Sequence, residues 1–132
     1  MENLGEACGE ADIITCATMA TEPVLKGEWI KAGTHVDLIG AFKPNMREAN
    51  DALLLKSELF VDSRDTTIGH IGEIDIPLNA GVIPLEHIRG DLYDLCKNKA
   101  ERGSTESITV FKNGGGAHLD LMTSMMIYEK CC

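Results

Sequence analysis

The sequence lacks an excess of positive charge. Its 132 residues include 12 Lys and Arg against 21 Asp and Glu, which gives a formal net charge of −9 at pH 7. Nucleic-acid binding depends on basic residues that neutralise phosphates, and an acidic surface repels them. The charge balance therefore argues against a nucleic-acid-binding protein.

Long apolar runs and metal-binding motifs are also missing. No stretch of 18 apolar residues offers a transmembrane helix, and the first residues carry no basic and apolar segment typical of a signal peptide. The five cysteines form no Cys-x-x-Cys pair and no zinc-like spacing with histidine. We therefore expect a cytoplasmic protein with reduced thiols, no membrane contact and no metal.

What is present is typical of one globular domain. Hydrophobic residues make up 44% of the chain and charged residues 25%, which is too apolar for a disordered protein. A chain of this length is expected to form a single domain with a real core.

Apolar runs of strand length alternate with segments of helical pattern. The run at 11–18 is apolar on both faces, as is typical of a buried parallel strand. Asn45 can cap a helix, with Glu48 completing a capping box. The alternation predicts an α/β fold with a parallel sheet. We expect strands at 11–18, 34–41, 58–62 and 107–111, and irregular structure at 63–84. Helices are expected at 47–57, at 86–100 with a break near Gly90, and at 117–130.

Ligands of open α/β sheets bind in a crevice at the carboxyl ends of the strands. Because parallel strands end at the same edge, residues that follow different strands are expected to share this crevice. In this sequence those residues are Thr18, Gly40, Ala41, Asn113 and Gly114.

Three glycines, at 114–116, lie between an expected strand and the last expected helix. Backbone N–H groups at such a turn can hold an anion, but glycines equally suit a tight structural turn. Residue 119 is not glycine, so the run is no dinucleotide fingerprint, and no P-loop follows. A complete nucleotide-binding fold would need another such turn, and the sequence has none.

Other polar residues are weaker candidates for chemistry. His118 and Asp120 open the last expected helix and are local candidates for proton transfer, although the helix dipole alone favours Asp120 there. The four histidines lack metal spacing, which favours ordinary surface or hydrogen-bonded roles. Glu73 is expected to be a solvated loop charge.

The last expected helix, at 117–130, is apolar on most of its faces. Such a helix needs cover on several sides, and a chain this short has little structure to supply it. The helix therefore suggests that partner structure is missing.

Five segments resemble the ornithine cyclodeaminase/mu-crystallin family, in the family's order. They are EPVLKGEWIKAGTH at 22–35, IGAFKPNMRE at 39–48, FVDSR at 60–64, IGEI at 71–74 and TVFKNGGGAHLD at 109–120. Members of that family are longer, with an N-terminal substrate and dimerisation domain before a Rossmann domain that binds NAD or NADP. The resemblance implies that residues 1–132 form the C-terminal part of the Rossmann domain. It also implies that the last helix packs back on a missing N-terminal domain.

The resemblance also implies roles for individual residues. Thr18 is similar to a threonine that contacts the cofactor, and Ile39, Gly40 and Ala41 to the stretch beside the nicotinamide. Asn113 stands where many members have a serine near the cofactor. Gly114 stands at a backbone position that contacts substrate.

Two positions depart from true ornithine cyclodeaminases. Phe42 replaces the aspartate that transfers a proton, which phenylalanine cannot do, and Met46 replaces a cofactor-contacting lysine. The departures leave the catalytic residue unassigned. They favour an NAD- or NADP-dependent reductase of a cyclic imino acid (pyrroline- or piperideine-2-carboxylate), or an amino-acid dehydrogenase. The resemblance implies that the full-length protein is a homodimer. The alternatives are a non-catalytic mu-crystallin-like protein that binds a cofactor or ligand, and an inactive truncated fragment.

Overall fold

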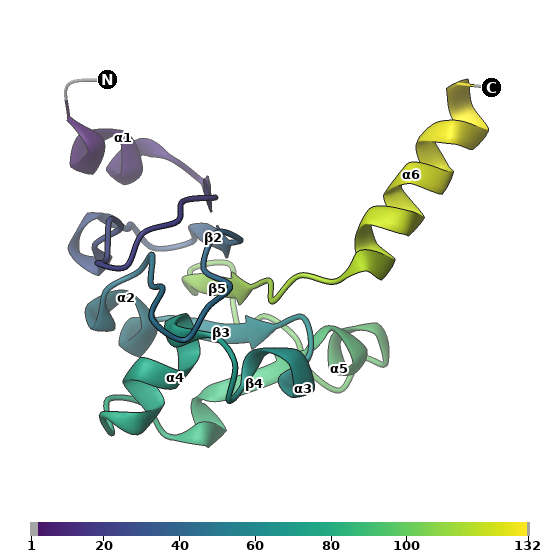
Figure 1. Ribbon diagram of the computed structural model, residues 1–132. Helices are drawn as coiled ribbons and strands as arrows, with labels where there is room; N and C mark the ends of the chain where they lie inside the picture. Colours follow the sequence, from purple (N-terminus) through teal and green to yellow (C-terminus); the bar gives the residue numbers. More distant parts are fainter. Residues whose placement is uncertain (1–2, 132) are drawn as a thin grey trace.

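The computed structural model describes residues 3–131, apart from the side chain of His118, and within them builds one sheet of five parallel strands (Figure 1). The strand order is β1-β2-β5-β3-β4, and each neighbouring pair is parallel. The α/β fold with a parallel sheet is therefore confirmed. The strands are β1 Ile13–Cys16, β2 His35–Leu38, β3 Glu58–Val61, β4 Ile88–Asp91 and β5 Thr109–Lys112. The α-helices are α1 Leu4–Glu10, α2 Asp51–Lys56, α3 Arg64–Thr67, α4 Gly72–Asn79, α5 Leu92–Cys96 and α6 Ala117–Cys131, with short 3-10 turns at Gly27–Trp29 and Leu85–His87.

The core lies on one face of the sheet. Alternate residues of a strand point to the same face, so β2 and β3 each place two apolar side chains there. α2 and α4 cover this face, and Leu53 and Ile74 from these helices are fully buried. The fully buried strand residues of this core are Val36, Leu38, Leu59, Val61 and Val110.

The helix expected at 47–57 is shorter, and Asn50 rather than Asn45 caps it. The segment before α2 is extended instead of helical, because the backbone N–H of Leu25 donates to the carbonyl of Glu48 at 2.9 Å. The predicted capping box between Asn45 and Glu48 is therefore wrong. The Glu48 side chain instead accepts hydrogen bonds from Thr18 and Gly40, after β1 and β2.

Two other segments differ from expectation. Residues 63–84 hold α3 and α4. Gly72 opens α4 because the chain passes close by, and a Cβ there would lie 2.3 Å from a backbone oxygen of Pro44. Residues 86–100, expected to be a helix with a break near Gly90, divide into part of a 3-10 turn, β4 and α5. Gly90 lies inside β4, and Asp91 then caps α5.

The first strand was expected to be buried on both faces, and this is wrong for the residues described. β1 lies at an edge of the sheet, and Ile13 is 70% exposed. Parallel strands are normally covered on both faces, which is why the apolar pattern suggested burial. β1 thus offers an open strand edge and an open apolar face.

α6 extends away from the sheet (Figure 1). The expectation that the chain leaves this helix uncovered is confirmed over its described side chains. Those that are at least 52% exposed are Leu121, Met122, Met125, Met126, Ile127 and Tyr128. Within residues 3–131, no helix has the length and apolar character needed to cross a membrane.

Substitution of Leu59 by alanine is expected to lower the free energy of unfolding by about 2 to 5 kcal/mol, because a fully buried side chain leaves a cavity in the centre of the core. Leu55, on α2, is 53% exposed. Leu55→Ala is the matched control and should cost less than about 1 kcal/mol, since alanine favours helix. Urea unfolding of the two variants measures the difference, and equal losses would contradict this description of the core.

Candidate functional site

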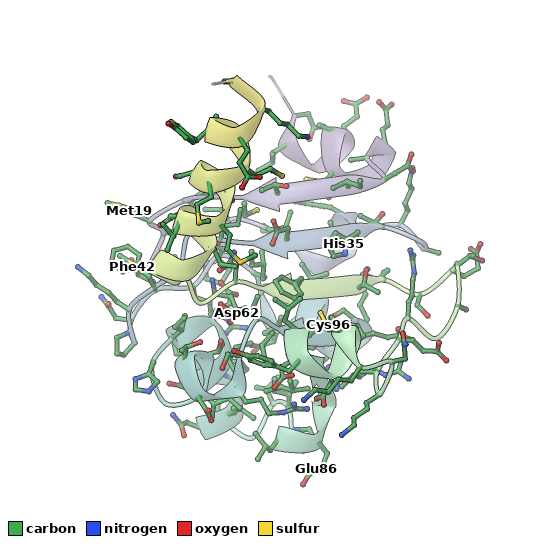
Figure 2. The ribbon with its side chains drawn as sticks, turned by 90° about the vertical axis from the view of Figure 1, so that its right-hand side faces the viewer. Met19, His35, Phe42, Asp62, Glu86 and Cys96 are labelled. Carbon is green, nitrogen blue, oxygen red and sulfur yellow. The ribbon has the colours of Figure 1, made fainter. Side chains whose placement is uncertain are left out.

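The carboxyl ends of the strands meet at one edge of the sheet. Figure 2 shows Met19, Phe42 and Asp62 on the side where the strand arrows end, away from His35 at the start of β2. The segments that follow β1 and β2 lie very close together at this edge. A Cβ on Gly40 would lie only 1.9 Å from the carbonyl oxygen of Thr18, so this approach requires glycine.

Glu48 joins the ends of β1 and β2. Its side chain is fully buried, and each carboxylate oxygen accepts two hydrogen bonds. Oε1 accepts from the backbone N–H and the hydroxyl of Thr18, at 2.6 and 2.7 Å. Oε2 accepts from the N–H groups of Gly40 and Ala41, at 2.8 and 3.3 Å. One carboxylate thus holds three of the residues that the sequence placed in the crevice.

Glu73 lies behind this contact. Its carboxylate accepts the backbone N–H groups of Glu48 and Ala49 at 2.6 and 3.0 Å. The side chain is fully buried, so the expectation of a solvated loop charge is wrong. Burial raises the pKa of Glu73 above its ordinary value of 4.5, although the two N–H groups oppose this.

Lys112 ends β5 on the core face of the sheet and is also fully buried. Its ammonium group donates to the carbonyl of Leu38 at 2.8 Å and to that of Asn113 at 2.5 Å. Burial lowers the pKa of Lys112, and the negative charges of Glu73 and Glu48 oppose this. Lys112 therefore ties β2 to β5 and offsets the buried carboxylates.

Asp62 holds the other part of the edge. Its Oδ1 accepts from the hydroxyl of Thr67 at 2.9 Å and the N–H of Ser63 at 2.7 Å. Its Oδ2 accepts the N–H of Gly114 at 2.8 Å. The predicted substrate contact is thus fixed to the end of β3.

The glycine run contains a tight turn. Gly115 has φ of +80°, a conformation that glycine adopts readily, and its N–H donates to the side-chain oxygen of Asn113 at 2.8 Å. The run therefore has a structural role at Gly115. Whether the run also holds a ligand stays a prediction.

The remaining predicted positions differ in exposure. Ile39 and Phe42 are 42% and 52% exposed beside the edge. Ala41 is fully buried and packs in a small cluster with Met46 and Ile71, so any contact of Ala41 with a cofactor is through the backbone. Met46 is an apolar core residue.

Among the described side chains, Asp120 is the proton-transfer candidate on α6, and it makes no hydrogen bond to this edge. Asp120 is exposed in the first turn of α6. The side chain of His118 lies outside the described residues. His35 and His87 are hydrogen-bonded, at 2.8 Å to the hydroxyl of Thr109 and 2.7 Å to the carbonyl of Leu54, in agreement with ordinary histidine roles.

A cavity of about 230 Å³ opens beside this edge. It has a polar end at Asp62, Ser63 and Thr66, and an apolar wall from α5 and α6. Two hollows of about 300 and 260 Å³ lie elsewhere, one around Arg89 and the other over the sheet near His35. The edge thus combines fixed backbone groups with adjacent open space.

The chemistry offered here is mainly positioning. The carboxylates of Glu48 and Asp62 are occupied by hydrogen bonds, and Phe42 has no proton to transfer. The exposed Lys43 supplies a positive charge, with its ammonium 5.2 Å from the centre of the Phe42 ring. This surface suits a flat ring with a negatively charged neighbour.

Sequence reasoning missed the charged residues beneath the edge. The sequence pattern indicates for Glu48 only the partner position of a capping box, and it indicates no site role for Glu73, Asp62 or Lys112. The available signal was a charged residue inside an apolar segment, as for Glu73 between Ile71 and Ile74. Such residues are rarely buried unless they are paired or hydrogen-bonded.

Comparison with known proteins agrees with this description. The model of the ornithine cyclodeaminase/mu-crystallin family matches residues 2–132. A Delta(1)-pyrroline-2-carboxylate reductase of Paracoccus denitrificans is 58% identical over 96% of this chain and 40% of its own length. The ketimine reductase mu-crystallin of Mus musculus is 37% identical over 94% of this chain and 37% of its own.

A solved structure is also similar. The Thermococcus litoralis Delta(1)-pyrroline-2-carboxylate reductase, in complex with NADH and L-proline, matches with a TM-score of 0.89 and 37% identity. The match covers 98% of this chain and 41% of that one. The chain thus spans about 40% of the length of the first curated relatives it matches.

Replacement of Glu73 by glutamine is expected to change the pH dependence of stability. Because the folded-state pKa of Glu73 is raised, its contribution is fully present below the unfolded pKa near 4.5 and is lost as pH rises through the folded pKa. Relative to Glu73→Gln, the wild type should therefore lose stability as pH rises above about 4.5. Urea midpoints across this range measure the effect. The exposed Glu86→Gln is the control and should follow the wild type, and a parallel curve for Glu73→Gln would contradict the prediction.

Proposed function

Since the chain belongs to the ornithine cyclodeaminase/mu-crystallin family, we propose that the protein containing it is an NAD(P)-dependent reductase of a cyclic imino acid. The substrate we favour is Δ1-pyrroline-2-carboxylate, which reduction of its C=N bond converts to proline. The observation that carries the proposal is the high identity to the Paracoccus denitrificans reductase. The likeness to a structure that holds NADH and L-proline supports it.

We assign the cofactor contacts to the ends of β1, β2 and β5. The proposed residues are Thr18, Ile39, Gly40, Ala41 and Asn113, with Gly114 beside the substrate. Gly40 supports the assignment, because its missing side chain lets the ends of β1 and β2 approach closely enough for Thr18 and Gly40 to lie side by side. Exposed Ile39 and Phe42 add apolar surface against which a nicotinamide ring can lie.

The reduced nicotinamide supplies the hydride when it is bound. The residues of this chain orient the reacting groups, and orientation is a large part of the rate in such a transfer. The imine nitrogen also gains a proton, and Phe42 cannot provide it. The donor is therefore another group: Asp120 or His118 of α6, a residue in the rest of the protein, or solvent.

We further propose that residues 1–132 are the C-terminal part of a Rossmann domain, with α6 packed on an N-terminal domain. The open edge of β1 and the exposed apolar side chains of α6 support this, because both need cover. The share of the relatives' length that the chain spans agrees with it. The homodimer implied by the resemblance, and the cytoplasmic location expected from the cysteine pattern and the first residues, stay predictions.

A non-catalytic ligand-binding protein is the second candidate, favoured by the absence of an acid at Phe42. The mouse mu-crystallin relative is itself named a ketimine reductase, so kinship with a crystallin does not argue against turnover. The chain alone is expected to be inactive in either case.

The full-length protein is expected to oxidise NADH or NADPH in the presence of Δ1-pyrroline-2-carboxylate and to form proline. Absorbance of the reduced nicotinamide and chromatography of the product measure this. Ornithine with NAD+ should release no ammonia, because Phe42 replaces the proton-transferring aspartate. Cofactor binding without turnover would favour the binding protein, and neither binding nor turnover would contradict both candidates.

Asn113→Leu in the full-length protein is expected to raise the KM for NADH about tenfold, or about 1.4 kcal/mol in binding free energy, since the larger apolar side chain disturbs the cofactor contact and the turn at Gly115. Asn113→Ser is the matched control. A serine hydroxyl can accept the same backbone N–H, so its KM should stay within about twofold of wild type. An unchanged KM in Asn113→Leu would remove Asn113 from the proposed site.

A further inference from the structure

The carboxylate of Glu48 is fully buried at a place where packing of the apolar core alone would not put a charge. It extends from the loop segment before α2 and ends between the last residues of two neighbouring strands. An apolar side chain would fill a core site at lower cost, because a buried charge is expensive unless it is fully hydrogen-bonded. The four hydrogen bonds that Glu48 accepts therefore offset the cost of burying its charge.

We propose that Glu48 is a positioning residue for the nicotinamide end of the cofactor. By drawing the N–H groups of Thr18, Gly40 and Ala41 onto one carboxylate, Glu48 fixes the gap between β1 and β2 before the cofactor binds. This inference rests on the proposed function, since these residues are the proposed cofactor contacts.

The hydrogen bonds of Glu48 set the orientation of the strand ends. The three backbone N–H groups point inward to the carboxylate, at 2.6 to 3.3 Å. The crevice side of the edge is then left to the exposed side chains of Ile39 and Phe42, since the bare Cα of Gly40 faces Thr18 and the carboxylate of Glu48. Such an apolar surface can lie flat against the ring of a nicotinamide.

The backbone of Glu48 is fixed by a hydrogen bond on the core side. Glu73 accepts its backbone N–H at 2.6 Å, so the segment that carries the carboxylate cannot easily move. Lys112 binds the carbonyl of Leu38, two residues before Gly40, and carries the opposite charge. Glu73 and Lys112 are both fully buried on the core side. They therefore fix the ends of β1 and β2 without occupying the crevice.

The contacts of Glu48 are confined to the cofactor half of the edge. The proposed substrate contact, Gly114, is held instead by Asp62. The two carboxylates therefore act on different ligands. Loss of Glu48 should weaken cofactor binding, whereas loss of Asp62 should weaken substrate binding.

The test is steady-state kinetics of Glu48→Gln in the full-length protein with NADH and Δ1-pyrroline-2-carboxylate. A glutamine oxygen can serve one pair of donors, but its NH2 group then faces the other pair. We expect the KM for NADH to rise about tenfold and the KM for the imino acid to stay within about twofold. Asp62→Asn should show the opposite pattern. Glu86→Gln, on the exposed surface away from this edge (Figure 2), should change neither.

A purely structural role would reduce the fraction of active enzyme, so kcat would fall with both KM values unchanged. That outcome in Glu48→Gln, or an equal rise of both KM values, overturns the inference. A wild-type protein without turnover contradicts the proposed function instead. The two failures are therefore distinguishable.

If Glu48→Gln does not fold, amide hydrogen exchange of the wild-type protein, measured with and without NADH, tests the inference. The amides of Gly40 and Ala41 should be protected without NADH and change little when it binds, because Glu48 already holds them. Free exchange that becomes protected only with NADH would show that the cofactor, not Glu48, orders this edge.

Discussion

The burial of charged side chains beneath the carboxyl ends of the strands is the constraint on which this structure depends. Parallel strands end in loops whose backbone groups have lost their ladder partners and must find others. Here Glu48 and Asp62 accept those N–H groups, and Lys112 donates to the carbonyls between them. The cost of burying these charges is offset only while every bond is made, so the edge has essentially one arrangement.

A rigid edge and uncovered surfaces occur in the same chain. The carboxyl edge is satisfied by its own residues, whereas β1 and α6 expose apolar surface. In the proposed enzyme these belong together. The edge receives the nicotinamide and substrate, and the open surfaces receive the rest of the protein, which closes the site around them and excludes water.

The sequence predicted well where local signals agree. The strand at 58–62 is flanked by turn-forming residues, and the apolar helix at 117–130 follows three glycines, so both were found within a residue or two. It predicted poorly where distant contacts override local preference. Gly72 and Pro77 indicated irregular structure but belong to α4, because Gly72 is needed for close passage of Pro44. Asn45 does not cap a helix, because the backbone of residues 47 and 48 is hydrogen-bonded to the backbone of residues 20–25.

By itself, the sequence determined the α/β class, the parallel sheet and which residues follow β1, β2, β3 and β5, because hydrophobic period and turn chemistry are local properties. It predicted a helix where β4 lies. The motifs it carries also determined the family. Only the tertiary structure decided that Glu73 is buried, that Glu48 holds Thr18 to Gly40, and that Asp62 holds Gly114. Each of these contacts joins residues from separate elements, and a carboxylate's partner is set by which strands lie side by side, which no local pattern encodes.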